Sequence, residues 1–207
     1  MDEESPGLIF DVKSNLYWPA NESVDRCFKY MIDRVCDVDY LVKHARTKGV
    51  CVQAGGFVGM FPLRLAKFFE RVYTFEPIPH IYESLMANTS QVKSIVSECY
   101  ALSSAAGNLP MELHRSGCSR HNASAPTFFL ARTIDSLELP RCDAIYLDVE
   151  KHEVAALEGA ADTIKKFAPA IMVETHPDQR EAQDRLFSKL GYKEIAHVHS
   201  DRVFVRK

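Results

Sequence analysis

Residues able to carry acid–base chemistry gather where an apolar run of the sequence ends. The run Ala144 to Leu147 stops at Asp148, and His152 and Glu153 follow within five residues. A carboxylate and an imidazole at the end of a buried strand can accept a proton from a bound substrate or donate one to it. His176 closely follows a second apolar run. Glu150 and Glu153, which also follow the first run, have an alternative explanation that is not catalytic. The helix dipole favours acidic side chains in the first turn of a helix.

A glycine-rich turn lies between two other apolar runs. Val50 to Val52 is followed by Gln53-Ala54-Gly55-Gly56, which is typical of a buried strand that enters a tight turn. Such glycines let a ligand lie against bare backbone, and the N-terminus of the next helix offers unpaired N–H groups to an anionic group. About 20 residues further on, Glu76 ends the next apolar run, where a carboxylate can bind the two hydroxyls of a ribose. The pattern predicts a nucleoside-containing cofactor, and the spacing of residues 54, 56 and 59 keeps a nicotinamide cofactor as an alternative.

Apolar periodicity predicts the elements that position these residues. Strands are expected at residues 8–12, 50–52, 71–75, 94–102, 144–147, 170–173, 192–199 and 202–205, with another that begins at Thr127. Helices are expected at residues 24–35 with a cap at Asn21, then from Asp37 to Gly49, from Phe61 to Phe69, and at residues 79–88, 154–167 and 178–190. This alternation predicts an α/β fold with a doubly wound, mostly parallel sheet and one reversed C-terminal strand. The glycine turn and Asp148 should then share one edge of the sheet.

Two segments have weaker patterns. Residues 13–23 carry the single tryptophan, Trp18, in what we expect to be a loop. Residues 1–48 are expected to cover the glycine turn, so Trp18 either contacts the cofactor as a lid or packs in the core. Residues 103–127 are polar and contain glycines and prolines, which predicts a long loop or hairpin, and such loops are often functional.

Composition excludes several classes of protein. A chain of 207 residues is long enough for one α/β domain, and we expect residues 1–207 to form one. The net charge of −3 and scattered basic residues argue against a nucleic-acid or anionic membrane partner. No apolar run approaches the length of a membrane span, and the acidic start lacks the pattern of a signal peptide, so we expect a cytoplasmic protein. The six cysteines form no C-x-x-C pair and should be free thiols.

Five stretches together resemble the FkbM-type family of S-adenosylmethionine-dependent methyltransferases. They are VCVQAGGFVGMFPLRLAKFFERVYTFEP from residue 50, TIDSL from 133, YLDVEKHEVAALEGA from 146, IMVETHP from 171 and LGY from 190. The resemblance covers residues 50–205 in the right order. It implies a class I methyltransferase domain, with a Rossmann-like, seven-stranded core at residues 49–207.

The resemblance also implies roles for individual residues. The turn Gln53, Ala54, Gly55, Gly56, Phe57, Val58 and Gly59 would hold the methionine part of S-adenosyl-L-methionine. Glu76, beside Pro77, would bind the ribose hydroxyls, and Ala101, Leu102 and Ser103 would flank the adenine. Asp148 would face the methyl group and the acceptor. Members of the family typically O-methylate hydroxyl groups of sugars and natural products, which implies a small-molecule or glycan acceptor.

Three departures from the family pattern stand near these sites. The family usually has an acid in place of Gln53, an asparagine in place of Phe57, and Gly-Ala in place of Lys151-His152. Glutamine keeps an acceptor oxygen but removes a negative charge near a cationic cofactor. Lys151-His152 places bulky, titratable side chains beside the acceptor. The departures favour either an altered acceptor or a partly filled pocket.

Methyl transfer to an acceptor hydroxyl is the leading hypothesis, and the cofactor and acceptor need mainly to be aligned. His152 has the best-suited intrinsic pKa for a base, near 6.5, with Asp148, Glu153 and His176 as alternatives. We predict no metal site, although a cation held by Asp148, Glu150 and Glu174 is an alternative. Two other functions stay open: a nicotinamide-dependent reductase, and a methyltransferase fold that has lost turnover and serves as a binding protein.

Overall fold

The computed structural model describes residues 7–114 and 119–207. The acidic start of the chain and Cys118 therefore lie outside the described residues. The other five cysteines are free thiols, as predicted. Within the described ranges, no helix is both long and apolar enough to cross a membrane.

A seven-stranded sheet forms the centre of the molecule. Its strands are β3 (Val50–Ala54), β4 (Arg71–Phe75), β5 (Ile95–Glu98), β10 (Ala144–Leu147), β11 (Ala170–Glu174), β12 (Tyr192–Val198) and β13 (Asp201–Arg206). They lie in the order β12-β13-β11-β10-β3-β4-β5. Only β13 runs opposite to the other six strands of this sheet, because it returns from the hairpin with β12 and inserts beside β11. The predicted doubly wound, mostly parallel sheet with a reversed C-terminal strand is confirmed.

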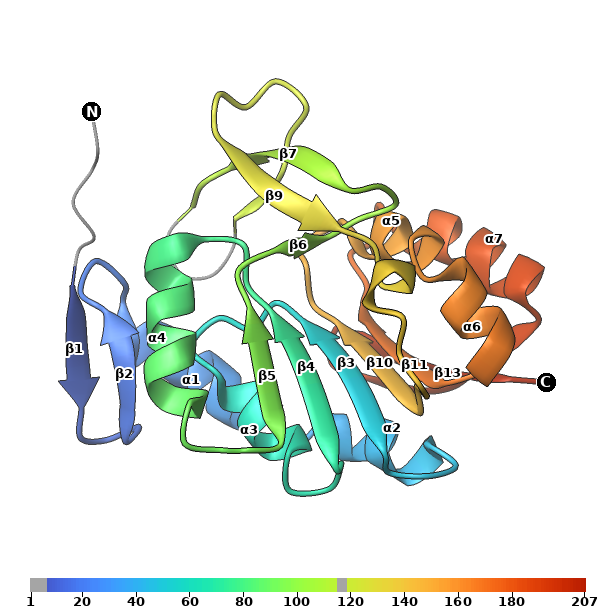
Figure 1. The fold of residues 1–207 in the computed structure, drawn as a ribbon, viewed down its shortest axis with the longest axis horizontal. Coiled ribbons are helices and arrows are strands. Elements are labelled where there is room, and N and C mark those ends of the chain that lie inside the picture. The colour runs from blue at the N-terminus through green and yellow to red at the C-terminus, as the bar shows by residue number, and fades with distance from the viewer. Residues whose placement is uncertain (1–6, 115–118) are drawn as a thin grey trace.

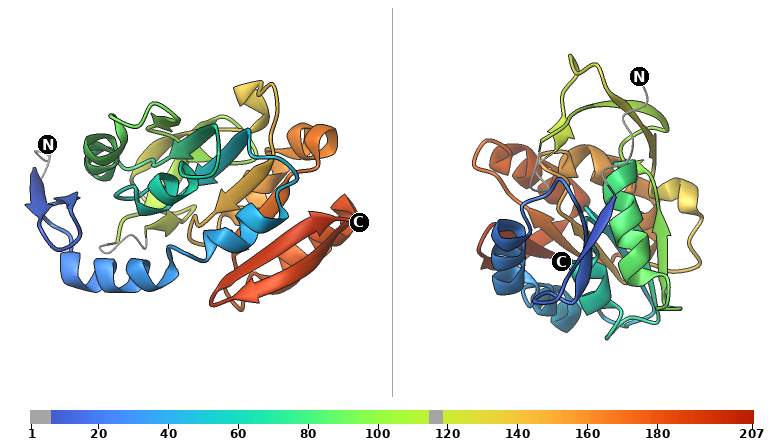
Figure 2. Two further views of the ribbon diagram at one scale, coloured as in Figure 1. Left: turned by 90° about the horizontal axis from the view of Figure 1, so that it is seen from below. Right: turned by 90° about the vertical axis from the view of Figure 1, so that its left-hand side faces the viewer.

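Helices cover both faces of this sheet (Figures 1 and 2). They are α1 (Val24–Arg34), α2 (Val38–His44), α3 (Met60–Leu65), α4 (Pro79–Thr89), α5 (Glu153–Glu158), α6 (Ala161–Phe167) and α7 (Arg180–Leu190). One apolar cluster joins α1, α2 and α3 to the face that carries Cys51 and Tyr146. The other joins α5, α6 and α7 to the face that carries Val52 and Ile145. Adjacent residues of one strand thus enter opposite cores, which explains their continuous apolar runs.

A second, smaller sheet lies over the carboxyl ends of β3, β4 and β10 (Figure 1). It consists of β6 (Ala101–Leu102), β7 (Gly107–Glu112), β8 (Arg120–His121) and β9 (Phe128–Arg132), and η1 (Asp135–Leu137) follows it. The strand predicted at residues 94–102 is therefore wrong as one element. The chain leaves the central sheet after Glu98, and β6 pairs with β9 instead.

The segment that contains Trp18 is a strand instead of the predicted loop. β1 (Leu8–Asp11) and β2 (Leu16–Pro19) form an antiparallel hairpin that packs against α4 (Figure 2). The Asn88 side chain fixes this hairpin, because its Nδ2 donates to the Tyr17 and Val58 carbonyls and its Oδ1 accepts from the Tyr17 N–H. One side chain thus joins the hairpin to the glycine turn.

Several predicted helix boundaries are wrong. Ser23, not Asn21, precedes α1, and α2 ends at His44 because Ala45 adopts an extended conformation. The helix predicted from Phe61 to Phe69 ends at Leu65. The helix predicted at 154–167 breaks at Gly159, where a Cβ atom would lie 2.0 Å from the Ser103 carbonyl oxygen.

In α7 the buried face differs from the predicted one. Gln183 and Phe187 are buried, whereas Ala182, Leu186 and Leu190, the apolar stripe from which the sequence predicts the buried face, are half-buried. Gln183 can be buried because its amide donates to the Glu174 carbonyl and accepts from Thr175.

Candidate active site

The glycine turn lies against the ends of β4 and β10. The N–H groups of Gly55 and Gly56 both donate to the Phe75 carbonyl, at 3.1 and 2.9 Å. Gly55 has φ +81°, and a Cβ atom there would lie 1.9 Å from the Asp148 carbonyl oxygen. Only glycine fits this position, for reasons of both conformation and space. The turn therefore keeps bare backbone beside Asp148, as the sequence predicts.

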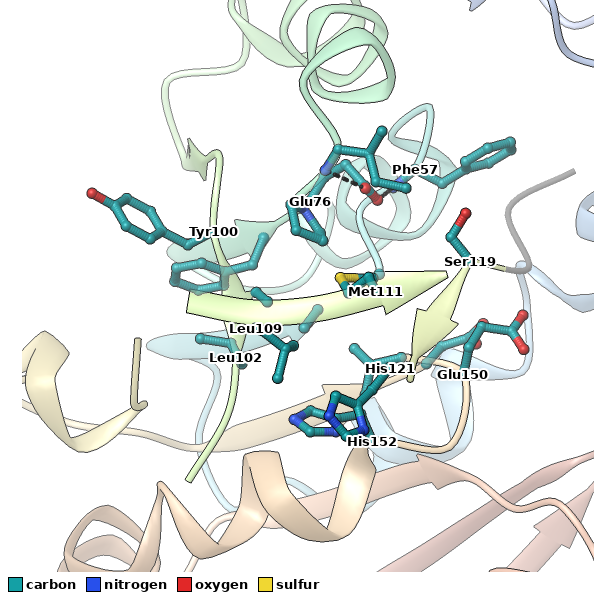
Figure 3. Close-up of a pocket in the computed structure, with 18 of the residues that line it drawn as sticks. Phe57, Glu76, Tyr100, Leu102, Leu109, Met111, Ser119, His121, Glu150 and His152 are labelled. Carbon is teal, nitrogen blue, oxygen red and sulfur yellow. Dashed lines mark hydrogen bonds between the residues drawn. The ribbon is translucent and has the colours of Figure 1, made fainter. Parts of the chain in front are cut away.

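Glu76 connects this turn to the start of α4. Its Oε2 accepts from the Phe57 N–H and its Oε1 from the Ile78 N–H, both at 3.1 Å (Figure 3). Burial raises the pKa of Glu76 to about 7, against the opposing effect of these two bonds. Each carboxylate oxygen keeps a free lone pair that a ribose hydroxyl could use. The Phe57 N–H already donates to Glu76, so it is not available to a ligand.

A narrow cavity of about 60 Å³ begins at Glu76 and runs beneath the second sheet. Its apolar side chains include Ile78, Ile81, Leu102 and Leu109, with Tyr100 at the rim (Figure 3). Of the predicted cofactor contacts, Ala54, Gly55, Phe57, Glu76, Pro77, Ala101, Leu102 and Asp148 line it. The cavity thus has a carboxylate at Glu76 and apolar side chains around Leu102.

A larger cavity of about 360 Å³ adjoins the first and shares Gly55, Phe57, Glu76, Asp148 and Glu150 with it. Helix α1 covers it with Arg26, Cys27, Tyr30 and Met31, and the end of β11 contributes Glu174 and His176. The two cavities meet at Asp148. A ligand in one cavity can therefore reach a ligand in the other cavity at the end of β10.

Three carboxylates crowd the wall of the larger cavity. Burial, together with the negative charges of Glu174 and Glu150, raises the pKa of Asp148 well above its usual range. Burial and neighbouring carboxylates also raise the pKa of Glu174 to about 8. The His176 Nε2 lies 2.9 Å from Glu174 Oε2 and 3.8 Å from Glu150 Oε2. The structure thus brings together two of the predicted catalytic residues, Asp148 and His176.

His152 lies on the other side of Asp148 and differs from the expectation for a base. Its Nε2 lies 2.9 Å from Ser103 Oγ, and its ring packs on His121 with centroids 5.0 Å apart (Figure 3). Burial, with a further contribution from His121, lowers the pKa of His152 to about 4. The value near 6.5 expected from the sequence is therefore wrong. His152 is neutral at pH 7 and lines the narrow cavity, whereas Ser103, its hydrogen-bond partner, does not line it.

Glu153 points into the protein instead of toward either cavity. Its Oε1 accepts from the Val149 N–H at 3.0 Å, and its side chain is 1% exposed. Burial raises its pKa to about 8. Glu153 therefore fixes the β10–α5 turn. It lines neither cavity, so no contact supports its predicted catalytic role.

Six of the predicted cofactor contacts line neither cavity: Trp18, Gln53, Gly56, Val58, Gly59 and Ser103. Gln53 is fully buried, and its Nε2 donates to the carbonyls of Ala54 and Gly55 while its Oε1 accepts from Thr74. Trp18 is also fully buried and packs edge-on against Phe57, with ring centroids 5.8 Å apart. Val58 is buried too. Of the two roles considered for Trp18, this geometry favours core packing.

Lys151 adopts a backbone conformation that favours glycine. Glu150 and Lys151 have φ of +52° and +76°. Positive φ costs a non-glycine residue about 1 kcal/mol, and such strain is often found at functional sites. This conformation explains the glycine that the family resemblance places at position 151.

We therefore expect Lys151→Gly to raise the free energy of unfolding by about 1 kcal/mol, because the strain at φ +76° disappears. The substitution also removes the Lys151–Asp178 ion pair, but this pair is exposed and its loss costs less than the relief of strain gains. Urea denaturation measures the change. Lys151→Ala is the matched control, since it removes the ion pair and keeps the strain; equal stability of the two variants would contradict the explanation.

Several residues that line the cavities were missed from the sequence. Leu109 and Met111 of β7, with Ser119 and His121 near β8, close the narrow cavity. The alternation of Leu109 and Met111 with Pro110 was the available signal, because alternating side chains of a strand face one side. Tyr30 on α1 had no comparable signal, since it is 52% exposed and its place beside the larger cavity depends on how α1 lies over the sheet.

The arrangement of the central sheet is that of class I methyltransferases. The structure of methyltransferase FkbM from Methylobacillus flagellatus has a TM-score of 0.58 at 15% identity, covering 88% of this chain and 58% of that one. Magnesium protoporphyrin IX methyltransferase from Synechocystis, solved with bound SAM, has a TM-score of 0.53 at 14% identity, covering 89% and 82%.

Sequence comparison gives the family. The model of the methyltransferase FkbM domain matches residues 63–194, which is more than half of the chain. The hexuronic acid methyltransferase AglP of Haloferax volcanii is 26% identical over 144 residues, covering 65% of this chain and 60% of that protein. The chain belongs to the FkbM methyltransferase domain family. It spans about three fifths of the length of AglP and of the FkbM structure.

Proposed function

We propose that this protein transfers a methyl group from S-adenosyl-L-methionine to a hydroxyl of a sugar or another small molecule. The observation that carries the proposal is the junction of the two cavities at Asp148. There a glycine without room for a side chain, Gly55, lies between Glu76 and the carboxylates. Family membership supports methyl transfer over the nicotinamide-dependent reductase.

The residues of the narrow cavity fit the proposed cofactor. Glu76 would accept hydrogen bonds from the ribose hydroxyls, and the apolar side chains around Leu102 would contact the adenine. The methionine part would lie against Gly55 and Phe57, where the cavities join. When bound, the cofactor would supply an electrophilic methyl group on a positively charged sulfur.

Asp148 is the residue best placed to act on an acceptor. It lines both cavities, and its raised pKa makes its carboxylate a stronger base than an exposed aspartate. A positive charge beside it would favour the ionised form that can take the hydroxyl proton. His176 and Tyr30 line the acceptor side and can orient the acceptor by hydrogen bonds.

The larger cavity supports a polar acceptor of modest size. Its lining combines carboxylates, an imidazole and an arginine with the aromatic rings of Tyr30 and Phe61. Rings with surrounding hydrogen-bonding groups suit the faces and hydroxyls of a sugar. AglP, by its name, acts on a hexuronic acid, which supports the sugar class for this chain.

Titration calorimetry tests the cofactor proposal. At pH 8 we expect S-adenosyl-L-methionine to bind with one site per chain, and NADH not to bind. Because the pKa of Glu76 is about 7 and the charged form makes the stronger hydrogen bonds, affinity should fall as the pH decreases. The loss from pH 8 to pH 6 should be up to about tenfold.

Glu76→Gln is the matched variant, since it keeps the volume and one acceptor oxygen. We expect it to bind at least tenfold more weakly at pH 8, and its affinity to be insensitive to this pH change, because the titrating group is gone. A melting curve establishes that the variant is folded. A folded variant with unchanged affinity would overturn the proposed position of the ribose.

A further inference from the structure

Beyond the cofactor, the wall of the larger cavity gathers a set of potential metal ligands. Glu150, Glu174 and His176 each offer one ligand atom, and these three atoms lie within 4.8 Å of one another. Ligand atoms that share a metal ion at about 2.0–2.3 Å lie about 3 to 4.5 Å apart, so small side-chain rotations would bring them to one centre. The set differs from the one considered from the sequence, because His176 joins it in place of Asp148.

The backbone places these three side chains together. Glu174 is the last residue of β11, and His176 follows it at the carboxyl edge of the sheet. Glu150 lies just beyond the end of the neighbouring parallel strand, β10, where its positive φ turns the chain. Glu174 is 7% exposed, whereas Glu150 and His176 are half-buried at the cavity. In such a site Glu174 would bind a cation from the buried side, and Glu150 and His176 would leave the cation accessible from the cavity.

A separate observation points to a missing positive charge here. Asp201 lies on β13 directly opposite Glu174, so the two side chains point to the same face of the sheet. Asp201 is 4% exposed, and within the described part of the chain its Oδ1 has no hydrogen-bond partner. A buried carboxylate oxygen without a partner is costly unless a cation or a proton compensates it.

Among the nearby cations of the protein, Arg34 acts on these carboxylates, because its positive charge partly lowers the pKa values of Asp148 and Asp201 that burial raises. Arg34 donates to Ser200 at 2.6 Å, and Lys151 pairs with Asp178 at 2.7 Å. Arg26 lines the cavity but is exposed. Arg34 thus offsets part of the negative charge, but in the part of the chain that the structure describes it forms no hydrogen bond to Asp201 Oδ1.

We propose that Glu150, Glu174 and His176 bind one divalent cation at the wall of the larger cavity. Two carboxylates with one imidazole suit Mn²⁺, because carboxylates favour Mn²⁺ and Mg²⁺ while imidazole favours the transition metals. Three protein ligands leave coordination positions that face the cavity. There the cation would bind oxygen atoms of the acceptor, a role that rests on the proposed function, although cation binding itself does not.

The cation would also change which acceptors the cavity accepts. Without it, the carboxylates repel an anionic acceptor such as a sugar acid. With it, hydroxyl and carboxylate oxygens of the acceptor become ligands, and the metal polarises a bound hydroxyl.

Titration with MnCl₂ at pH 8, followed by calorimetry and by the electron paramagnetic resonance of free Mn²⁺, tests the site. The wild-type chain should bind one Mn²⁺. His176→Ala and Glu150→Gln should each weaken binding at least tenfold, and melting curves establish that both are folded. His114→Ala is the matched control, because His114 contacts one carboxylate, Glu112, at 3.5 Å outside the site. It should bind Mn²⁺ like the wild type.

Absence of Mn²⁺ binding at millimolar concentration, or equal binding by all four proteins, would overturn the site and leave protons as the compensating charge. Calorimetry with S-adenosyl-L-methionine in the absence of metal keeps the two proposals apart. Mn²⁺ binding that depends on His176 without cofactor binding would support the cation site and contradict the proposed function. The reverse result would contradict the cation site alone.

Discussion

Gly55→Ala should abolish detectable binding of S-adenosyl-L-methionine and lower the free energy of unfolding by about 3 kcal/mol. The new Cβ would lie 1.9 Å from the Asp148 carbonyl oxygen, so the turn or β10 must move. Either movement changes the junction at which both cavities meet. Calorimetry and urea denaturation measure the two effects.

Gly191→Ala is the matched control for backbone strain. Gly191 has φ +73°, close to the value of Gly55, but a Cβ atom there meets nothing within 4 Å. This control should cost about 1 kcal/mol of stability and leave cofactor affinity unchanged. If Gly55→Ala behaves like Gly191→Ala in both measurements, the close approach of the turn to Asp148 has no role in binding.

Asp148→Asn should lower kcat by about 10²–10⁴-fold and change the affinity for S-adenosyl-L-methionine by less than threefold. Asparagine keeps the size of the side chain but cannot accept a proton from the acceptor, and general-base catalysis contributes about this much. A residue that acts in the transition state affects kcat without affecting cofactor binding. Single-turnover kinetics with a methylated product as readout measures the effect.

Asp178→Asn is the control for the loss of a carboxylate, because Asp178 is exposed and pairs with Lys151 outside both cavities. It should turn over like the wild type. Near-normal turnover of Asp148→Asn would transfer the role of base to another group. His152 would not be the first choice, because its pKa of about 4 makes it a weak base.

Local sequence patterns are sufficient to predict the turn and the strand ends. Val50 to Val52 and Ala144 to Leu147 are apolar without interruption because each strand is buried on both faces, so their ends could be located. Parallel strands bring their carboxyl ends to one edge. The meeting of Gly55 and Asp148 follows from these two facts.

Features that depend on contacts distant in sequence could not be predicted. β6 leaves the central sheet to pair with β9 about 30 residues later, and no local pattern at Ala101 indicates this. The pKa of His152 is lowered by burial and by His121, which comes from the second sheet. A reference pKa cannot include either effect.

The role of Glu76 was predicted only in part. Its place after β4 followed from the sequence, but its bonds to the Phe57 and Ile78 N–H groups did not. These bonds make Glu76 a support of the turn as well as a ligand-binding candidate. For that reason glutamine is a better test substitution than alanine.

Transfer of a labelled methyl group tests the central proposal most directly. The chain is incubated with methyl-labelled S-adenosyl-L-methionine and a fractionated extract of small molecules and glycans, and products are identified by mass spectrometry. We predict label on the oxygen of a small-molecule or glycan hydroxyl, and its loss with Gly55→Ala and Asp148→Asn. Cofactor binding with no labelled product in any fraction, or product formed equally by both variants, would contradict the proposal.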